Sequence, residues 1–192
     1  MSHDPDRFEH VEVQSSEDLW AWMAAHYAQE DAIWLVTWKA AHRDKYVSRE
    51  TVLDVLIAYG WVDGRRMKLD DGRTMQLVAP RQEQAWAQTY KDRAARLEAE
   101  GMMQNPGRVA IMRSKQSGKW NAMAKVDALD EPEDLVKALK RYRAKSWWDA
   151  AAPSYRRNIL RWIAGAKKDT TRSNRIEIAS EHAARGEKVP QY

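Results

Sequence analysis

The sequence predicts an α+β protein, with a small antiparallel or mixed sheet in its N-terminal half and a helical bundle in its C-terminal half. Alternating or β-branched runs are confined to residues 1–80, whereas apolar residues recur at helical spacing over residues 81–192. The 192 residues include 10 Trp and 7 Tyr, more ring area than a disordered chain carries. We expect the two halves to pack as one compact unit.

The first three elements follow from short local patterns. Residues 8–13 alternate apolar and polar side chains, which predicts a short edge strand. Ser15 precedes an acidic turn and an apolar stripe, which predicts a helix over residues 15–28 because a hydroxyl cap and early acids suit the positive end of the helix dipole. Residues 33–38, IWLVTW, are β-branched and aromatic, and they form the clearest predicted strand.

A second helix and a hairpin complete the first half. Ser48 is expected to cap the helix, and the segment GWVDG at 60–64 predicts a tight reversal that ends it. Two alternating runs, residues 65–69 and 73–79, flank the sequence DDG. Such a turn between such runs predicts a β-hairpin, because glycine tolerates the positive φ of tight turns.

Beyond residue 80 the pattern is helical throughout, and the first of these helices is expected to cover one face of the sheet. The predicted helices are 83–100, 106–116, 131–140, 145–151, 153–166 and 169–185. Val109 and Met112 are expected to face inward. The helix at 153–166 carries an apolar stripe that includes Trp162, and we expect this stripe to be buried.

Several classes of chemistry are excluded by the residues that the chain lacks. There is no cysteine, so disulfides and thiolate chemistry are ruled out. The 5 histidines show no metal-ligand spacing, and no glycine-rich phosphate loop occurs. We therefore expect no metal and no cofactor. No signal-like start or membrane-length apolar run is present, so we expect a cytoplasmic protein without membrane insertion.

The segment at 60–64 is the first candidate site. Asp63 could lie at the mouth of a pocket beside Trp61, as a general base or as an anchor for a cationic group. Alternatively, Trp61 fills the core and Asp63 only forms the turn. We favour the structural interpretation.

The basic tail is the second candidate site. Residues 137–192 carry 14 Lys and Arg against 5 Asp and Glu. Lys167, Arg172 and Arg175 straddle the start of the last predicted helix, where free N–H groups favour an anion such as a small phosphate-type ligand. The basic face could equally be solvated or paired with acids elsewhere. Specific nucleic-acid binding is not expected, because aromatic residues do not interleave with the basic ones.

Adjacent tryptophans form a third feature. Trp147 and Trp148 follow one another in a predicted helix, and neighbouring helical residues cannot both face one core. A protein interface near Trp147 and Trp148 is one explanation.

Longer segments carry a family resemblance. They are IWLVTWK at 33–39, GWVDG at 60–64, LVAPR at 77–81, WAQTYKDRAARLEAEGMM at 86–103, GKWNAMAKVDALDEPEDLVKAL at 118–139 and PSYRRNILRWIAGAKKDTTRSNRIE at 153–177. Over about residues 15–188 the chain resembles the YdeI/OmpD-associated family of bacteriocin-protection proteins, whose C-terminal region would span about 120–186. The resemblance implies a link to bacteriocin tolerance but no reaction, cofactor or catalytic residue. Two departures are a glycine-poor loop at 39–45 and the Trp147–Trp148 pair.

These observations lead to a functional hypothesis with alternatives. We expect a non-catalytic binding or stress-tolerance protein whose ligand site combines Trp61 and Asp63 with Lys167, Arg172 and Arg175. One alternative is an enzyme acting on a small anionic metabolite, with Asp63 as base and an arginine as electrostatic clamp. Another is weak, non-specific nucleic-acid binding through the basic tail.

Overall fold

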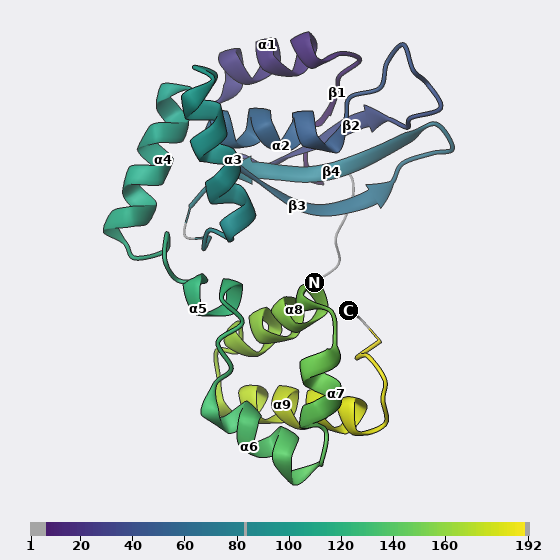
Figure 1. Cartoon of the computed structure of the whole chain (residues 1–192). Coiled ribbons are helices and arrows are strands. Elements are labelled where there is room, and N and C mark those ends of the chain that lie inside the picture. Colours follow the sequence, from purple (N-terminus) through teal and green to yellow (C-terminus); the bar gives the residue numbers. More distant parts are fainter. Residues whose placement is uncertain (1–6, 83, 191–192) are drawn as a thin grey trace. The chain divides into compact units, whose positions relative to one another are not determined.

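The computed structural model describes residues 7–82 and 84–190, and it divides the chain into two compact units. The first unit ends at Asn121 and the second starts at Ala122 (Figure 1). Among the described residues strands occur only in the first unit, and helices occur in both, so the predicted α+β class is confirmed. None of the described helices is long and apolar enough to cross a membrane.

The first unit contains a four-stranded mixed sheet with the strand order β1-β2-β4-β3. Its strands are β1 (His10–Glu12), β2 (Ile33–Trp38), β3 (Trp61–Lys68) and β4 (Arg73–Pro80). The edge strand β1 runs parallel to β2, whereas β4 is antiparallel to both of its neighbours. The edge strand expected within 8–13 and the central strand at 33–38 are both confirmed.

The β3–β4 hairpin closes on an acidic turn. The Asp70 carboxylate accepts the N–H groups of Gly72 and Arg73 at 2.9 and 2.7 Å, which fixes the turn that the DDG sequence predicts. The tight reversal expected over 60–64 is wrong, because β3 already begins at Trp61. Gly60 alone turns the chain, with φ of +73°, and a bulge between Asp63 and Arg66 takes up the irregularity.

Two capped helices pack on one face of the sheet. They are α1 (Ser16–His26) and α2 (Arg49–Ala58), whose N-cap serines, Ser15 and Ser48, accept backbone N–H groups as expected. The shared core includes Leu19, Met23, Ile33, Leu35, Val55, Leu56 and Val78. Alternate residues of the same strands face the other way and form a smaller cluster around Trp34, Val36 and Met75.

Two further helices belong to the first unit: α3 (Gln88–Ala99) and α4 (Asn105–Gln116). The α3 helix starts later than expected, and Trp86 lies before it, fully buried, with its indole N–H bonded to Ser114 at 2.8 Å. The range expected for α4 is confirmed, but the inward orientation of Met112 is wrong, since this side chain is 52% exposed. Val109 is half-buried.

Close backbone packing holds α4 against the end of α2. A Cβ atom at Gly107 would lie 2.4 Å from the carbonyl oxygen of Ala58. A Cβ at Gly60 would lie 2.9 Å from the carbonyl oxygen of Pro106. Both positions therefore need glycine if α4 is to approach this closely.

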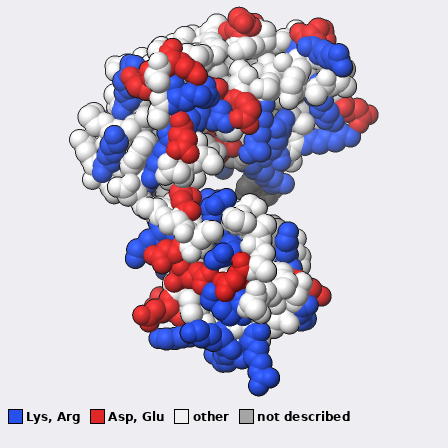
Figure 2. All heavy atoms as spheres, in the orientation of Figure 1, with Lys and Arg blue, Asp and Glu red and all other residues white. Residues whose placement is uncertain are grey.

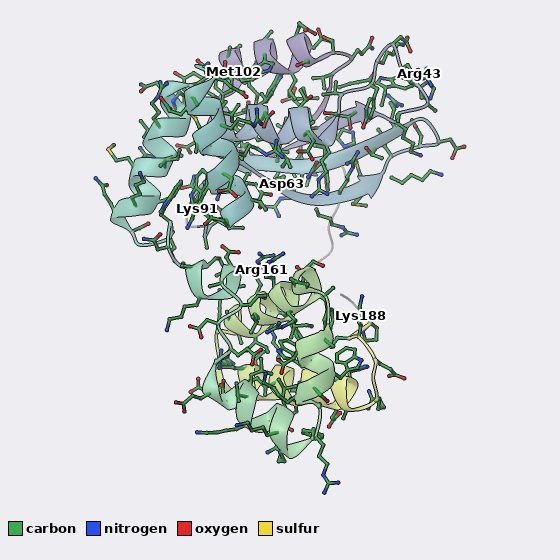
Figure 3. All side chains as sticks on the ribbon, viewed as in Figure 1. Arg43, Asp63, Lys91, Met102, Arg161 and Lys188 are labelled. Carbon is green, nitrogen blue, oxygen red and sulfur yellow. The ribbon has the colours of Figure 1, made fainter. Side chains whose placement is uncertain are left out.

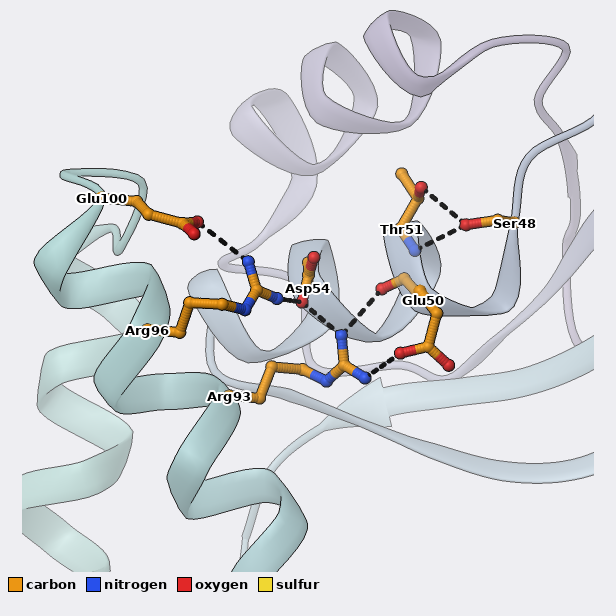
Figure 4. A network of polar contacts seen from close by, with 7 residues as sticks. All are labelled: Ser48, Glu50, Thr51, Asp54, Arg93, Arg96 and Glu100. Carbon is orange, nitrogen blue, oxygen red and sulfur yellow. Dashed lines mark hydrogen bonds and ion pairs between the residues drawn. The ribbon is translucent and has the colours of Figure 1, made fainter.

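A polar network also links α2 to α3 (Figure 4). The Asp54 carboxylate accepts hydrogen bonds from the guanidinium groups of Arg93 and Arg96. Arg93 also pairs with Glu50, and Arg96 pairs with Glu100. One carboxylate thus joins two arginines of the neighbouring helix.

In the part of the second unit that the structure describes, all regular elements are helices. Its helices are α5 (Ala124–Asp127), α6 (Glu133–Arg141), α7 (Lys145–Ala150), α8 (Pro153–Ala164) and α9 (Asp169–Ala184). They enclose a separate core that contains Leu135, Leu139, Trp148, Tyr155, Ile159, Leu160, Ile163, Ile176 and Ala179. The short α5 was not predicted. Trp162, expected to be buried, is half-buried, whereas Leu160 on the same helix is buried.

The contacts divide the chain at a different place from the change in secondary structure near residue 80. The helices α3 and α4 contact α2, and Trp86, Ala94 and Leu97 belong to the core of the sheet-bearing unit. The helices from α5 onward pack with one another around their own core.

Candidate functional site: an arginine-bearing cleft beside α4

The two residues predicted from the 60–64 segment lie on β3 and face the helix-covered side of the sheet. Trp61 is 1% exposed, and its indole N–H donates to the carbonyl oxygen of Tyr27 at 3.0 Å. Trp61 therefore belongs to the core of the first unit. Asp63 lies two residues further along the strand, opposite Val78 (Figure 3).

The Asp63 carboxylate accepts two side-chain hydrogen bonds. One comes from the amide nitrogen of Gln76 at 3.1 Å, and the other comes from the Tyr90 hydroxyl on α3. Burial, and then the hydrogen bond to Asp63, raise the pKa of Tyr90 to about 12. Tyr90 therefore stays protonated at neutral pH and continues to donate to Asp63.

Arg81 is the unexpected member of this cluster. It directly follows β4, and its backbone N–H donates to the carbonyl oxygen of Gly60 at 2.9 Å. Its guanidinium carbon lies 4.1 Å from the centre of the Trp86 ring and 5.7 Å from that of Tyr90. The residue is only 9% exposed.

The buried guanidinium of Arg81 forms no ion pair with any carboxylate in the described part of the chain. Its Nε atom is buried without a hydrogen-bond partner, and its single side-chain hydrogen bond is a long one, 3.4 Å, to the Gln84 carbonyl. Burial lowers the pKa of Arg81, although the negative charges of Asp63 and of Tyr90 once it is ionised act in the opposite direction. Buried charges are normally paired, so this arginine requires an explanation.

A cleft of about 450 Å³, which we call the α4 cleft, opens beside Arg81. Its floor is the sheet end with Gly60, Trp61, Pro80, Arg81 and Gln82, and its walls are the α1–β2 loop and α4. An adjoining hollow of similar volume shares Arg81 and continues along α4 to Gln116 and Ser117.

A second cation, Arg113 on α4, lines both hollows. Arg113 is exposed and makes no ion pair with the described residues. The rings of Tyr27 and Tyr59 line the opposite side and stack on each other with centroids 6.0 Å apart. The cleft thus offers two guanidinium groups, one carboxylate (Glu30) and an aromatic wall, so its lining is cationic on balance. Guanidinium forks suit carboxylates and phosphates.

The basic residues predicted in the tail lie in the second unit and are engaged there. Arg172 forms two hydrogen bonds to Asp134, at 2.8 and 3.0 Å. Arg175 donates to the Trp162 carbonyl and lies over that ring. Lys167 is exposed.

The Trp147–Trp148 pair separates into a buried and a half-buried ring. Trp148 is fully buried and donates to Glu131 at 2.8 Å. Trp147 packs edge-on against Tyr155, with centroids 6.0 Å apart. Both tryptophan rings thus pack against other residues of the second unit.

Sequence reasoning missed Arg81, Arg113 and Tyr90. The available signal was the position of Arg81, directly after the proline that ends a buried strand, where side chains at the sheet end gather. In the described residues no group of three or more His, Asp or Glu side chains could hold a metal ion. Basic and acidic side chains are interspersed on the visible face of both units (Figure 2).

The fold and the cleft thus define a two-unit α+β protein with a candidate anion site in its sheet-bearing unit. Over residues 11–110 the chain matches the model of a domain of unknown function (DUF8412), and it belongs to that family. Residues 128–186 match the model described as bacteriocin-protection, YdeI or OmpD-associated, which confirms the predicted resemblance for this part of the chain. Searches of curated proteins and of solved structures gave no match.

Proposed function

We propose that the chain is a cytoplasmic, non-catalytic protein that binds a small organic anion in the α4 cleft. The supporting observation is the Arg81 guanidinium, buried on Trp86 without a carboxylate partner among the described residues. Burying an unpaired charge is costly, and an anionic ligand would provide the missing partner. A guanidinium held in place by packing also loses little further freedom when it binds.

Arg113 and the tyrosine rings indicate what shape the ligand should have. Arg113 supplies a second, exposed cation on the α4 wall, and the stacked rings of Tyr27 and Tyr59 supply an aromatic edge to the cleft. The ligand class is therefore a carboxylate or phosphate attached to a small planar body. A volume of about 450 Å³ is within the range of small-molecule sites.

The residues around the cleft favour binding over catalysis. The cleft lining contains no histidine among the described residues, and the Ser117 hydroxyl is directed to the Ser114 carbonyl. Asp63, the base in the enzymatic alternative, already accepts hydrogen bonds from Tyr90 and Gln76. A nucleophile next to a free base, which acyl or phosphoryl chemistry needs, is not among these contacts.

Calorimetric titration with benzoate and phenyl phosphate tests the proposal, with benzylammonium as the charge-reversed probe. We expect both anions to bind and the cation not to bind. Arg113→Gln should weaken anion binding about tenfold, the loss of roughly one charge-assisted hydrogen bond. Arg43→Gln is the matched control, because Arg43 is exposed in the β2–α2 loop outside the cleft (Figure 3).

Two results would contradict this proposal. If neither benzoate nor phenyl phosphate binds, the proposal is wrong. If Arg113→Gln and Arg43→Gln weaken anion binding equally, the binding reflects the overall charge of the protein and not a site in the cleft. The same variants address the wider role in bacteriocin or stress tolerance, which the match of the second unit suggests. Expressed in a bacteriocin-sensitive strain, the wild-type chain should raise survival more than Arg113→Gln does.

A further inference from the structure

A third hollow lies between α3 and α4, and we call it the α3–α4 groove. It has a volume of about 440 Å³. Its apolar lining consists of Ala94, Ala95, Ile111, Met112 and Trp120. No residue is shared between this lining and that of the α4 cleft. The two hollows are therefore separate sites of the same unit.

Met112 marks this groove as unusual for a water-exposed surface. At 52% exposure it is the most exposed large apolar side chain among the described residues. Its flexible thioether adapts to apolar ligands of varied shape, and methionines are common on such binding surfaces. An apolar hollow of this size beside an exposed methionine is a typical feature of a binding site.

The charges at the groove's two ends differ. The ammonium groups of Lys91 and Lys115 lie 5.4 and 5.2 Å from the centre of the Trp120 ring. Neither lysine forms an ion pair with a described residue. Toward the loop that joins the helices, Arg108 donates to both carboxylate oxygens of Glu98 at 3.0 Å. That end is neutralised, so two uncommitted cations remain beside Trp120.

We propose that the α3–α4 groove binds an amphipathic carboxylate with an aliphatic chain. The chain would lie along Ala95, Ile111 and Met112, and the carboxylate would lie between Lys91 and Lys115. Apolar burial provides the affinity, and the two lysines determine the sign of the head group. This site is independent of the anion site in the α4 cleft.

Calorimetric titration with decanoate below its micelle concentration provides the first test. Decyltrimethylammonium has the same chain with the opposite charge, and hexanoate has the same head group with a shorter chain. We expect decanoate to bind, decyltrimethylammonium to bind at least tenfold more weakly, and hexanoate about 100-fold more weakly because four methylenes are lost. Equal affinity for decanoate and decyltrimethylammonium would overturn the proposal.

Two pairs of matched variants locate the site. Met112→Asp should weaken decanoate binding at least tenfold, whereas Met102→Asp should not, because Met102 is 39% exposed but outside the groove lining. The double change Lys91→Gln with Lys115→Gln should weaken binding about fivefold or more. Its control is Lys125→Gln with Lys140→Gln, two exposed lysines of the second unit. Thermal melts check that each variant folds.

The same titrations separate this site from the α4 cleft. Arg113→Gln should leave decanoate binding unchanged. Loss of decanoate binding in Arg113→Gln, with Met112→Asp unaffected, would place decanoate in the α4 cleft and overturn the proposal for the groove. Absence of decanoate binding to the wild-type chain would also overturn it, without affecting the result for benzoate and phenyl phosphate.

Discussion

The two units hold buried arginine in different ways. In the second unit, Arg156 and Glu131 form an ion pair at 2.6 Å, with side chains 17% and 13% exposed, and Glu131 also accepts from Trp148. In the first unit, Arg81 is also buried, but its guanidinium lies on the ring of Trp86 and forms no ion pair with a carboxylate among the described residues. The comparison teaches that a high density of basic residues in the sequence does not show where a positive charge is free to bind an anion. The most basic stretch of the sequence contains arginines paired with carboxylates, such as Arg156 and Arg172, whereas the two arginines of the candidate site form no ion pair with a described residue.

The largest effect on stability is expected from removing Glu131, the carboxylate that pairs with Arg156. Glu131→Ala leaves Arg156 buried without its partner, so the free energy of unfolding of the second unit should fall by about 3 kcal/mol. Urea unfolding followed by far-ultraviolet circular dichroism measures it. Glu133→Ala, which removes an acid that is 90% exposed, should change stability by less than about 0.5 kcal/mol. Similar values for both variants would show that the pair contributes no more than a surface contact.

Asp54 provides an intermediate case within the first unit. This carboxylate joins Arg93 and Arg96, so Asp54→Ala should lower the free energy of unfolding by about 2 kcal/mol, the scale of hydrogen bonds to charged groups (Figure 4). Glu100→Ala removes one more exposed contact of Arg96 and should cost about 0.5 kcal/mol or less. Equal effects in urea unfolding would mean that Asp54 does not organise the network.

Tyr90, which lies next to Arg81, should make the free energy of unfolding depend on pH. Its pKa is raised to about 12 in the folded state, from 10 in the unfolded chain, so its contribution to stability is complete below pH 10. That contribution is lost as the pH rises toward 12, because the unfolded chain then releases the proton first. Tyr90→Phe should cost about 1 kcal/mol at pH 8, and the difference from the wild-type chain should shrink between pH 10 and 12. A difference that stays constant over this range would contradict the raised pKa.

The smallest effect is expected at Arg81 itself. Arg81→Met removes a buried charge but keeps an aliphatic side chain on Trp86, so the lost cation–π contact and the released desolvation cost should nearly cancel. The free energy of unfolding should change by less than about 1 kcal/mol, while binding of benzoate or phenyl phosphate is lost. If Arg81→Met instead costs as much as Glu131→Ala, Arg81 has a structural role and the contrast between the two units disappears.

Local patterns predicted most of the elements. The serine caps at Ser15 and Ser48, the run at 33–38 and the Asp-Gly turn all reflect short-range chemistry that the sequence displays directly. The start of β3 was missed because a single glycine, Gly60, makes the reversal that five residues were expected to make.

Features that depend on tertiary contacts were harder to predict. Met112 has helical spacing typical of a core residue, but α4 packs through glycine and leaves this side chain in water. The same limit applies to the candidate site. Arg81 resembles any other arginine in the sequence. Its significance depends on which groups its burial brings near and on its having no ion pair with a carboxylate among the described residues.

The two glycines at the base of α4 have a consequence for how the cleft could change. Because Gly60 and Gly107 bring α4 into backbone contact with the end of α2, main-chain atoms determine the spacing at this end of the cleft. The Arg113 side chain, which is exposed and forms no ion pair with a described residue, projects from that frame without supporting it. Selectivity could therefore be redesigned at the rim, one side chain at a time, on a scaffold whose dimensions stay constant.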